Sequence, residues 1–224
     1  MFPIRDRAPT KGFPIITILI ILVNVYFFVA ELLAPDPDLF ILKYALIPQL
    51  INFSDIPTLT PFLTAQFLHA GFLHIASNMW FFWIFGDNVE ARMGKIPFLI
   101  FYLFSGTVGF FVQYLFLSNS EIPMIGASGA VAGVLGAYLV FFPRARVDVL
   151  VPFFPLFFTL ALPASTMLFY WFFIQLFSGV ATIVAETSSV GGIAYWAHIG
   201  GFGTGYLIAH LFSSPRPKRQ TSFF

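Results

Sequence analysis

The chain has 224 residues, of which 58% are hydrophobic and only 9% are charged, and its formal net charge is +1. Soluble domains carry roughly 25% charged residues, so this composition predicts an integral membrane protein with the lipid bilayer as its solvent. One membrane domain, residues 1–224, fits this length. The near-neutral charge gives no basis for a nucleic-acid partner, and the lack of cysteine excludes disulfides, thiol catalysis and thiolate metal sites.

The first half of the chain predicts two membrane spans joined by an interfacial segment. Residues 1–13 form a short polar lead with basic residues, and 14–33 is a nearly uncharged run of about the ~20 residues needed to cross hydrocarbon. Residues 34–66 hold several prolines and apolar patches, so we expect this first loop to lie partly in the membrane interface. The second span, at about 67–86, is followed by a charged turn over 86–95.

The second half of the chain predicts an all-α arrangement that completes six spans. The four further spans lie at about 96–117, 128–142, 164–184 and 193–212. The fourth is short, because its about 15 residues rise only ~22 Å against ~30 Å of hydrocarbon. It should therefore begin below the outer surface, with Ser128 submerged. Prolines break the apolar stretch 147–162, which we expect to be an interfacial loop.

The distribution of basic residues supports six spans. Of the 11 Lys and Arg residues, all but Lys43 then fall on one side. By the positive-inside rule both termini, including the basic tail 213–224, should be cytoplasmic. Counting 147–162 as a seventh span would put that tail outside. The bare six-span form and short tails further suggest a prokaryotic cell membrane.

The stretch 125–136, IGASGAVAGVLG, places Ser128 between glycines at the start of the fourth span. Serine is a favoured N-cap residue, and small residues at Ala132 and Gly136 continue the face that carries it. Such a groove allows another helix to pack closely and to bring a base to a nucleophile. On this stretch alone, a capped helix with a small-residue packing face is the simpler interpretation.

The sixth span, AYWAHIGGFGTGY, carries His198 beside the small residues Ala197, Gly201 and Gly205. An ionisable residue inside a span points to function, although a histidine can also tie helices together by hydrogen bonds. If the two small-residue faces meet, Ser128 Oγ reaches His198. All acids lie in loops or at span ends, so we expect a dyad in which His198 takes the Ser128 proton and returns it to a leaving amine.

The second span supplies two possible oxyanion donors. His74 and Asn78 are four residues apart, hence on one helix face, and both can donate hydrogen bonds to a developing oxyanion. The alternative is that they only tie helices together. His69 points elsewhere and should be structural, and His210, near the cytoplasmic end, has no expected role. The chain has no His-Glu-x-x-His motif and no glycine-rich phosphate loop, so we expect no metal and no cofactor.

Together, these motifs resemble the rhomboid family of intramembrane serine proteases over nearly the whole chain. The resemblance rests on His74-Ile-Ala-Ser-Asn78, Gly126-Ala-Ser128-Gly129, Ala197-His198-Ile-Gly-Gly201-x-x-x-Gly205 and Glu90-x-Arg92-x-Gly94. It implies a Ser128/His198 dyad, an oxyanion site formed by His74 and Asn78, and a mobile cap and gate from 186–193 and the fifth span. It also implies cleavage of single-pass membrane proteins in or near the outer part of their span, at small residues in an easily unwound helix.

The resemblance has one departure and leaves two other functions open. Many members carry a Trp-Arg pair in the first loop, where this chain has Thr60-Pro61. The family also implies that Gln113 helps to hold water.

The alternative functions are a non-catalytic protein that binds client membrane proteins through the same fold, and a small transporter. The presence of both Ser128 and His198 argues against the first, and the lack of an internal repeat argues against the second.

Overall fold

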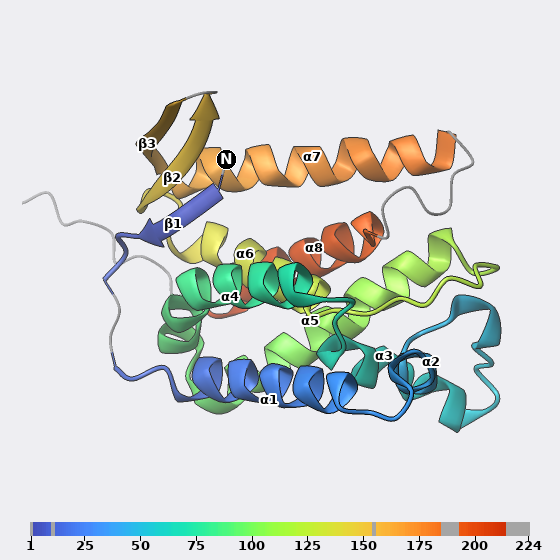
Figure 1. The fold of residues 1–224 in the computed structure, drawn as a ribbon. Coiled ribbons are helices and arrows are strands. Elements are labelled where there is room, and N and C mark those ends of the chain that lie inside the picture. Colours follow the sequence, from blue (N-terminus) through green and yellow to red (C-terminus); the bar gives the residue numbers. More distant parts are fainter. Residues whose placement is uncertain (1, 10–11, 154–155, 185–192, 214–224) are drawn as a thin grey trace, which may run out of the picture.

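The structure is a computed structural model that describes residues 2–9, 12–153, 156–184 and 193–213, and it is mainly helical (Figure 1). The long elements are α1 (Ile15–Leu32), α4 (Phe72–Met93), α5 (Lys95–Phe116), α6 (Ser128–Phe141), α7 (Ala164–Val184) and α8 (Tyr195–Leu211). Between α1 and α4 the chain forms α2 (Pro37–Tyr44), η1 (Pro48–Leu50), η2 (Ile56–Leu59), α3 (Pro61–Thr64) and η3 (Ala65–Phe67). The expected first loop is thus a chain of short helical turns.

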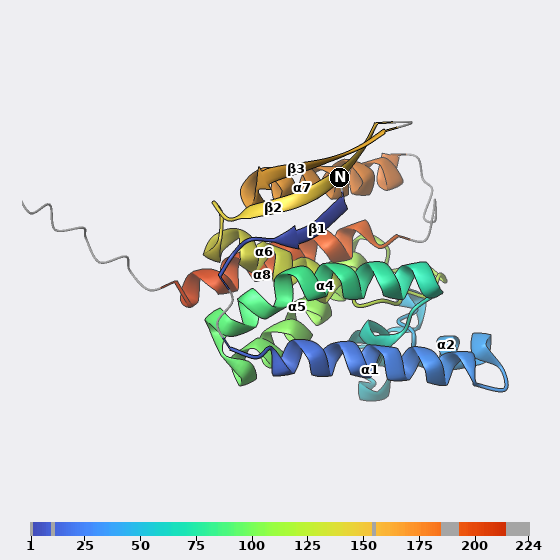
Figure 2. The same cartoon turned by 60° about the vertical axis from the view of Figure 1, so that its left-hand side comes forward.

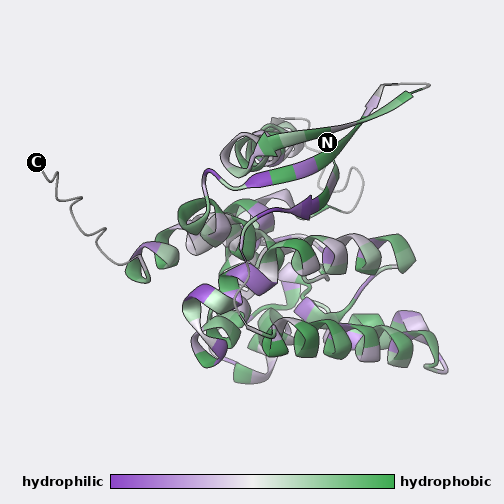
Figure 3. Ribbon diagram, turned by 90° about the vertical axis from the view of Figure 1, so that its left-hand side faces the viewer, coloured by the Kyte–Doolittle hydropathy of each residue, from purple (hydrophilic) through white to green (hydrophobic). Residues whose placement is uncertain are grey.

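Three helices, α1, α5 and α7, are long and apolar enough to cross a membrane by length and composition. Most residues of the helices are hydrophobic (Figure 3). Large apolar side chains such as Leu22, Leu73 and Ile100 are more than half exposed on the surface. These features identify an integral membrane protein. The other expected spans correspond to α4, which carries charged residues, and to α6 and α8, which have 14 and 17 residues.

The helix boundaries agree with the sequence prediction to within two residues for five of the six spans. The second span is the exception, because α4 begins only at Phe72 and runs through the predicted charged turn to Met93. Glu90 explains the extension, since its carboxylate is buried and accepts hydrogen bonds from the start of α1. The helix ends at Gly94, whose φ of +85° suits glycine.

A three-stranded antiparallel sheet corrects the all-α expectation. It consists of β1 (Phe2–Asp6), β2 (Arg146–Phe153) and β3 (Leu156–Pro163), in the order β1-β2-β3. The predicted polar lead and interfacial loop thus pair with each other, for example Asp6 with Val147. The sheet lies beside α7 on one side and α4 on the other (Figure 2). The alternating polarity that predicts a half-buried strand is confined to Arg146–Val149, and Pro152 and Pro155 interrupt the stretch that follows, so the sequence did not reveal the sheet.

Charged side chains fix β1 to its neighbours. Asp148 on β2 is buried and pairs with Arg5 Nε and Arg7 Nη2, each at 2.7 Å. These hydrogen bonds lower the pKa of Asp148 below its usual range. On the other side, Asp6 accepts hydrogen bonds from Tyr138 on α6 at 2.7 Å and from Asn88 on α4 at 2.9 Å. Burial raises the pKa of Asp6.

The helix α6 is buried along almost its whole length and forms the centre of the bundle. Its contact with α8 is made backbone to backbone. A β-carbon added at Gly201 would overlap the carbonyl oxygen of Gly129, and one added at Gly205 would overlap that of Gly133. The close contact between two small-residue faces, predicted from the sequence, is therefore present, and it brings the starts of α6 and α8 together.

Candidate active site

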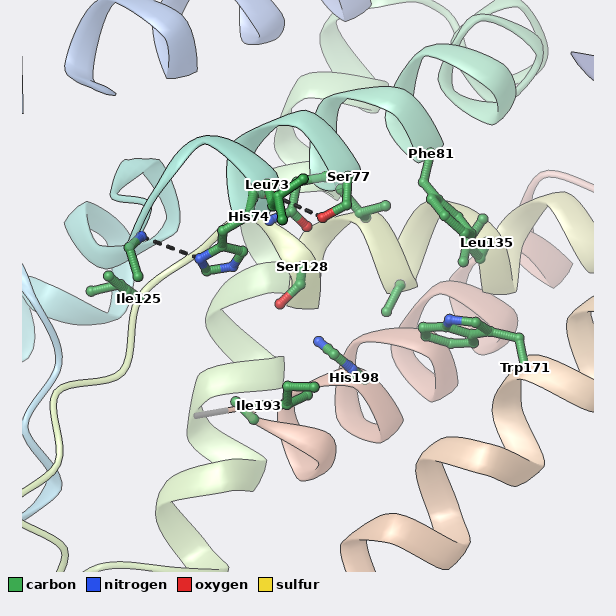
Figure 4. Close-up of a pocket in the computed structure, with 15 residues that line it drawn as sticks. Leu73, His74, Ser77, Phe81, Ile125, Ser128, Leu135, Trp171, Ile193 and His198 are labelled. Atoms are coloured by element: carbon green, nitrogen blue, oxygen red, sulfur yellow. Dashed lines mark hydrogen bonds between the residues drawn. The ribbon is translucent and has the colours of Figure 1, made fainter. Parts of the chain in front are cut away.

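A cavity of about 520 Å³ lies where α4, α6, α7 and α8 approach one another. Residues from all four helices line it (Figure 4), including His74 and Asn78 of α4, Ser128 of α6, Trp171 of α7 and His198 of α8. The four site residues predicted from the sequence therefore share one cavity. They come from three helices, and they meet at the cavity because α6 packs against both α8 and α4.

Ser128 is the first residue of α6, and the N-cap position belongs to Ala127. The expectation that the serine caps the helix is wrong, because no side chain caps α6. Within the described part of the chain, no hydrogen bond involves Ser128 Oγ, which points across the cavity toward the His198 ring (Figure 4). The first backbone N–H groups of a helix have no partner inside the helix. An uncommitted hydroxyl thus lies beside uncommitted N–H donors.

His198 lies near the start of α8 and is 9% exposed. Its Nδ1 is 2.7 Å from Oε1 of Gln175 on α7, which is also buried. The ring of Trp171 lies 5.8 Å from the His198 ring, at an interplanar angle of 33°. The contact with Gln175 could not be predicted from the sequence, because it depends on how α7 and α8 pack. The available signal was a single glutamine in an uncharged span.

His74 and Asn78 direct N–H groups toward the turn that precedes Ser128. The backbone N–H of Ala70 donates to His74 Nδ1 at 3.3 Å, so a neutral ring carries its proton on Nε2. A β-carbon added at Gly126 would lie 2.7 Å from that Nε2 and 3.9 Å from Asn78 Nδ2. Asn78 Nδ2 is buried and has no hydrogen-bond partner among the described residues. Two N–H groups therefore converge on Gly126, two residues before Ser128.

Gln113 of α5 connects that helix to the start of α8. Its Oε1 accepts a hydrogen bond of 3.0 Å from the backbone N–H of Ala197, the residue before His198. This contact fixes the backbone beside the expected base, whereas a role in holding water stays a prediction.

The two remaining histidines differ in their relation to the cavity. His69 is fully buried, and its ring packs against His74 with centroids 5.1 Å apart. Within the described ranges, neither ring nitrogen of His69 has a hydrogen-bond partner. His210 is exposed in the last turn of α8, where its Nδ1 lies 2.8 Å from the Tyr206 carbonyl oxygen.

The first loop is held without the Trp-Arg pair of the resembled family. Thr60 and Pro61 start α3, and Thr64 Oγ1 donates to the Tyr44 carbonyl at 2.8 Å. The buried Gln66 side chain donates to Leu103 O on α5. The loop is therefore anchored by hydrogen bonds to α5 and to the end of α2.

Some sequence predictions lie outside the described residues. These are most of the expected cap, 186–193, of which only Ile193 is described, where it lines the cavity, and most of the basic tail 213–224. Within the described ranges, no group of three or more His, Asp or Glu side chains could hold a metal ion.

Comparison with known proteins gives a consistent family assignment. The family model described as Rhomboid domain matches residues 57–215. Similar proteins are Rhomboid-like protein 11, chloroplastic, of Arabidopsis thaliana (38% identical over 39% of this chain and 31% of that protein) and Rhomboid protease GluP of Bacillus subtilis (42%, 34% and 15%). Presenilin-associated rhomboid-like protein, mitochondrial, of Homo sapiens is 32% identical over 44% of this chain and 26% of that protein.

The matched segment spans less than a third of the length of each of these relatives. Two of the three names refer to organelles, which runs against the prokaryotic membrane suggested by the short tails. For the location of the protein, the structure supports an integral membrane protein.

Proposed function

The chain belongs to the rhomboid family, and from this premise we propose that it is a serine endopeptidase that cleaves transmembrane segments of other membrane proteins. One observation carries the proposal. Ser128, His198 and the converging donors of His74 and Asn78 line a single cavity inside a membrane bundle. A nucleophile, a base and oxyanion donors around one space are the parts that acyl transfer requires.

In the first half of the proposed reaction, Ser128 Oγ attacks the carbonyl carbon of a peptide bond in the substrate. His198 accepts the hydroxyl proton as the new C–O bond forms. The negative charge that develops on the carbonyl oxygen is stabilised by N–H groups of His74 and Asn78 and by the backbone N–H groups at the start of α6. His198 then gives its proton to the leaving amine as the C–N bond breaks, and the substrate remains attached to Ser128 as an ester.

In the second half, a water molecule replaces the amine. His198 takes a proton from the water while its oxygen attacks the ester carbonyl, and the same N–H donors stabilise the second oxyanion. Collapse of this intermediate returns the proton to Ser128 Oγ and releases the new carboxylate. The polar side chains of α4 that line the cavity, Ser77 among them, provide surfaces that water can wet.

The proposed topology is a single membrane domain over 1–224 with six spans and both termini in the cytoplasm. The other three spans would be α4, α6 and α8, which are less apolar or shorter than α1, α5 and α7. Each packs against other helices of the bundle, so its polar or short segments need less contact with lipid. The submerged start of α6 would set the depth of cleavage, toward the outer part of a substrate span. The partners are single-pass membrane proteins and the surrounding bilayer.

Purified protein in detergent and in liposomes, treated with a fluorophosphonate probe and a fluorogenic transmembrane peptide, tests this function. Labelling and cleavage should disappear in Ser128→Ala and His198→Ala. Cleavage should fall on the order of 10²-fold or more in His74→Ala/Asn78→Ala, because oxyanion donors act on the transition state. Cleavage that persists in Ser128→Ala would overturn the proposal. A folded wild-type protein that neither labels nor cleaves would favour the client-binding alternative.

A further inference from the structure

We propose that Gln175 is a positioning residue for the base: its side-chain carbonyl holds His198 in the tautomer and orientation that present Nε2 to Ser128. The inference rests on the proposed proteolytic function and adds a residue to which none of the sequence motifs assigns a role. It is carried by the hydrogen bond between His198 Nδ1 and Gln175 Oε1, which is 2.7 Å long and buried.

The chemistry of the two groups fixes the direction of this hydrogen bond. An amide carbonyl oxygen only accepts, so His198 Nδ1 must donate and must carry the proton. A neutral imidazole has one N–H and one lone pair, and the lone pair is then on Nε2. That nitrogen is the one left to face the cavity and Ser128. The opposite tautomer would direct an N–H at Ser128 and could not accept its proton.

A second contact from the same helix fixes the plane of the imidazole. Trp171 lies one turn before Gln175 on α7, so both side chains point to the same face, and its ring packs against His198. Gly179, one turn further on, continues this face toward Trp196 of α8. The face of α7 that meets α8 thus places an aromatic ring over His198 and an amide at its edge.

An amide suits this position better than the carboxylate found in many triads. A carboxylate buried among apolar helices would need charged or multiple hydrogen-bonding partners to offset its desolvation. The carbonyl of Gln175 accepts the same hydrogen bond without introducing charge, as an asparagine does in some cysteine proteases. Among the described residues, Gln175 supplies the only hydrogen bond to the His198 ring.

Three variants separate positioning from helix packing. Gln175→Met keeps the length of the side chain but loses the acceptor. Its kcat should fall about two- to tenfold, because one net hydrogen bond shifts the balance between the two tautomers by about this factor. KM should stay within about twofold, because peptide binding does not use this group. Gln175→Glu supplies an acceptor oxygen again, because even a protonated carboxyl group keeps its carbonyl oxygen, and it should recover most of kcat. Ile174→Leu, an exposed neighbour on α7, is the matched control and should retain wild-type kcat.

The tautomer itself provides a readout that does not depend on turnover. In protein labelled with ¹⁵N-histidine and carrying Ser128→Ala, the ring nitrogens of His198 can be assigned by loss of signal in His198→Phe. The proton should sit on Nδ1 with Gln175 present and should redistribute to Nε2 in Gln175→Met. Unchanged kcat, an unchanged tautomer, or a loss of kcat that Gln175→Glu does not recover would each overturn the positioning role. Failure of the proposed function would be seen separately, as cleavage that survives Ser128→Ala.

Discussion

Glu90 on α4 receives two hydrogen bonds from Thr17 on α1, one from the backbone N–H and one from the hydroxyl, each 2.8 Å long. Its other carboxylate oxygen accepts the N–H of Ile16 at 3.0 Å. Pro14, at the N-cap position of α1, supplies no capping side chain. The start of α1 is therefore capped by a residue of another helix, which fixes the end of α4 against the start of α1.

Replacing Glu90 should destabilise the protein. Glu90→Ala would leave two buried backbone N–H groups without an acceptor, a cost of about 1–3 kcal/mol per group. Glu90→Gln keeps one oxygen and should lose less. The unfolding midpoint in detergent, followed by circular dichroism, should fall in the order wild type, Gln, Ala. Glu121→Gln, at an exposed carboxylate, is the control. Equal midpoints for wild type and Glu90→Ala would show that α1 does not need this cap.

The attachment of β1 should depend on pH through Asp148. Because Arg5 and Arg7 lower the pKa of this carboxylate below the ordinary 3.8, the pairing contributes its full stability above about pH 4 and loses it as the pH falls further. Hydrogen–deuterium exchange of residues 2–8, corrected for intrinsic rates, should therefore be slow and nearly constant from pH 7 to pH 5. It should accelerate once the pH drops below the pKa of folded Asp148.

Two comparisons isolate the role of Asp148. Asp148→Asn should show fast exchange in residues 2–8 at every pH, while Asp38→Asn, at an exposed carboxylate of α2, should behave like wild type. The arginines are more than half exposed, so 1 M salt should also weaken the attachment. Slow exchange in Asp148→Asn would mean that strand pairing and the Asp6 contacts hold β1 without the ion pairs.

The contact between α6 and α8 predicts opposite outcomes for two neighbouring glycines. Gly201→Ala would place a methyl group on the Gly129 carbonyl and force the helices apart, whereas nothing lies within 4 Å of a β-carbon at Gly203. Overpacking of this kind costs typically about 1–3 kcal/mol. Gly201→Ala should lower both the unfolding midpoint and fluorophosphonate labelling of Ser128. Gly203→Ala should retain both. Equal labelling in the two variants would contradict the backbone-to-backbone contact.

Five of the six long helices could be predicted from the sequence to within two residues, because each is a mainly apolar run with clear ends. The sheet could not, since four of the six long helices separate β1 from β2 in the chain, and polar and apolar residues alternate only over Arg146–Val149. The extension of α4 beyond Gly86 was hidden for a related reason. Its charged residues are typical of a turn in the sequence. In the structure one of them, Glu90, is buried because it caps the start of α1.

The shared cavity followed from local signals, namely a serine and a histidine each beside small residues, and His74 and Asn78 on one helical face. Gln175 was missed because its role depends on the register between α7 and α8, which the sequence does not show. The expected capping by Ser128 failed because Ala127 takes that position, which leaves the hydroxyl uncommitted.

Gly126 lies two residues before Ser128 and faces His74 and Asn78, the two proposed oxyanion donors. Its φ is +121°, a conformation that favours glycine, and a β-carbon there would lie 2.7 Å from His74 Nε2. Gly126→Ala should therefore displace the His74 ring and lower kcat on the order of 10²-fold, as loss of one oxyanion donor does in other hydrolases.

Gly94→Ala is the matched control for Gly126→Ala, because Gly94 also has a positive φ, +85°, but nothing lies within 4 Å of its β-carbon. It should lose stability through backbone strain, of about 1–2 kcal/mol, while each folded molecule keeps its kcat. Turnover normalised to the folded fraction distinguishes the two effects. If the two variants lose the same normalised kcat, the effect of Gly126→Ala comes from strain and not from displacement of His74. If only Gly126→Ala loses it, the donor must reach the turn before Ser128 for catalysis, which requires a side-chain-free residue at position 126.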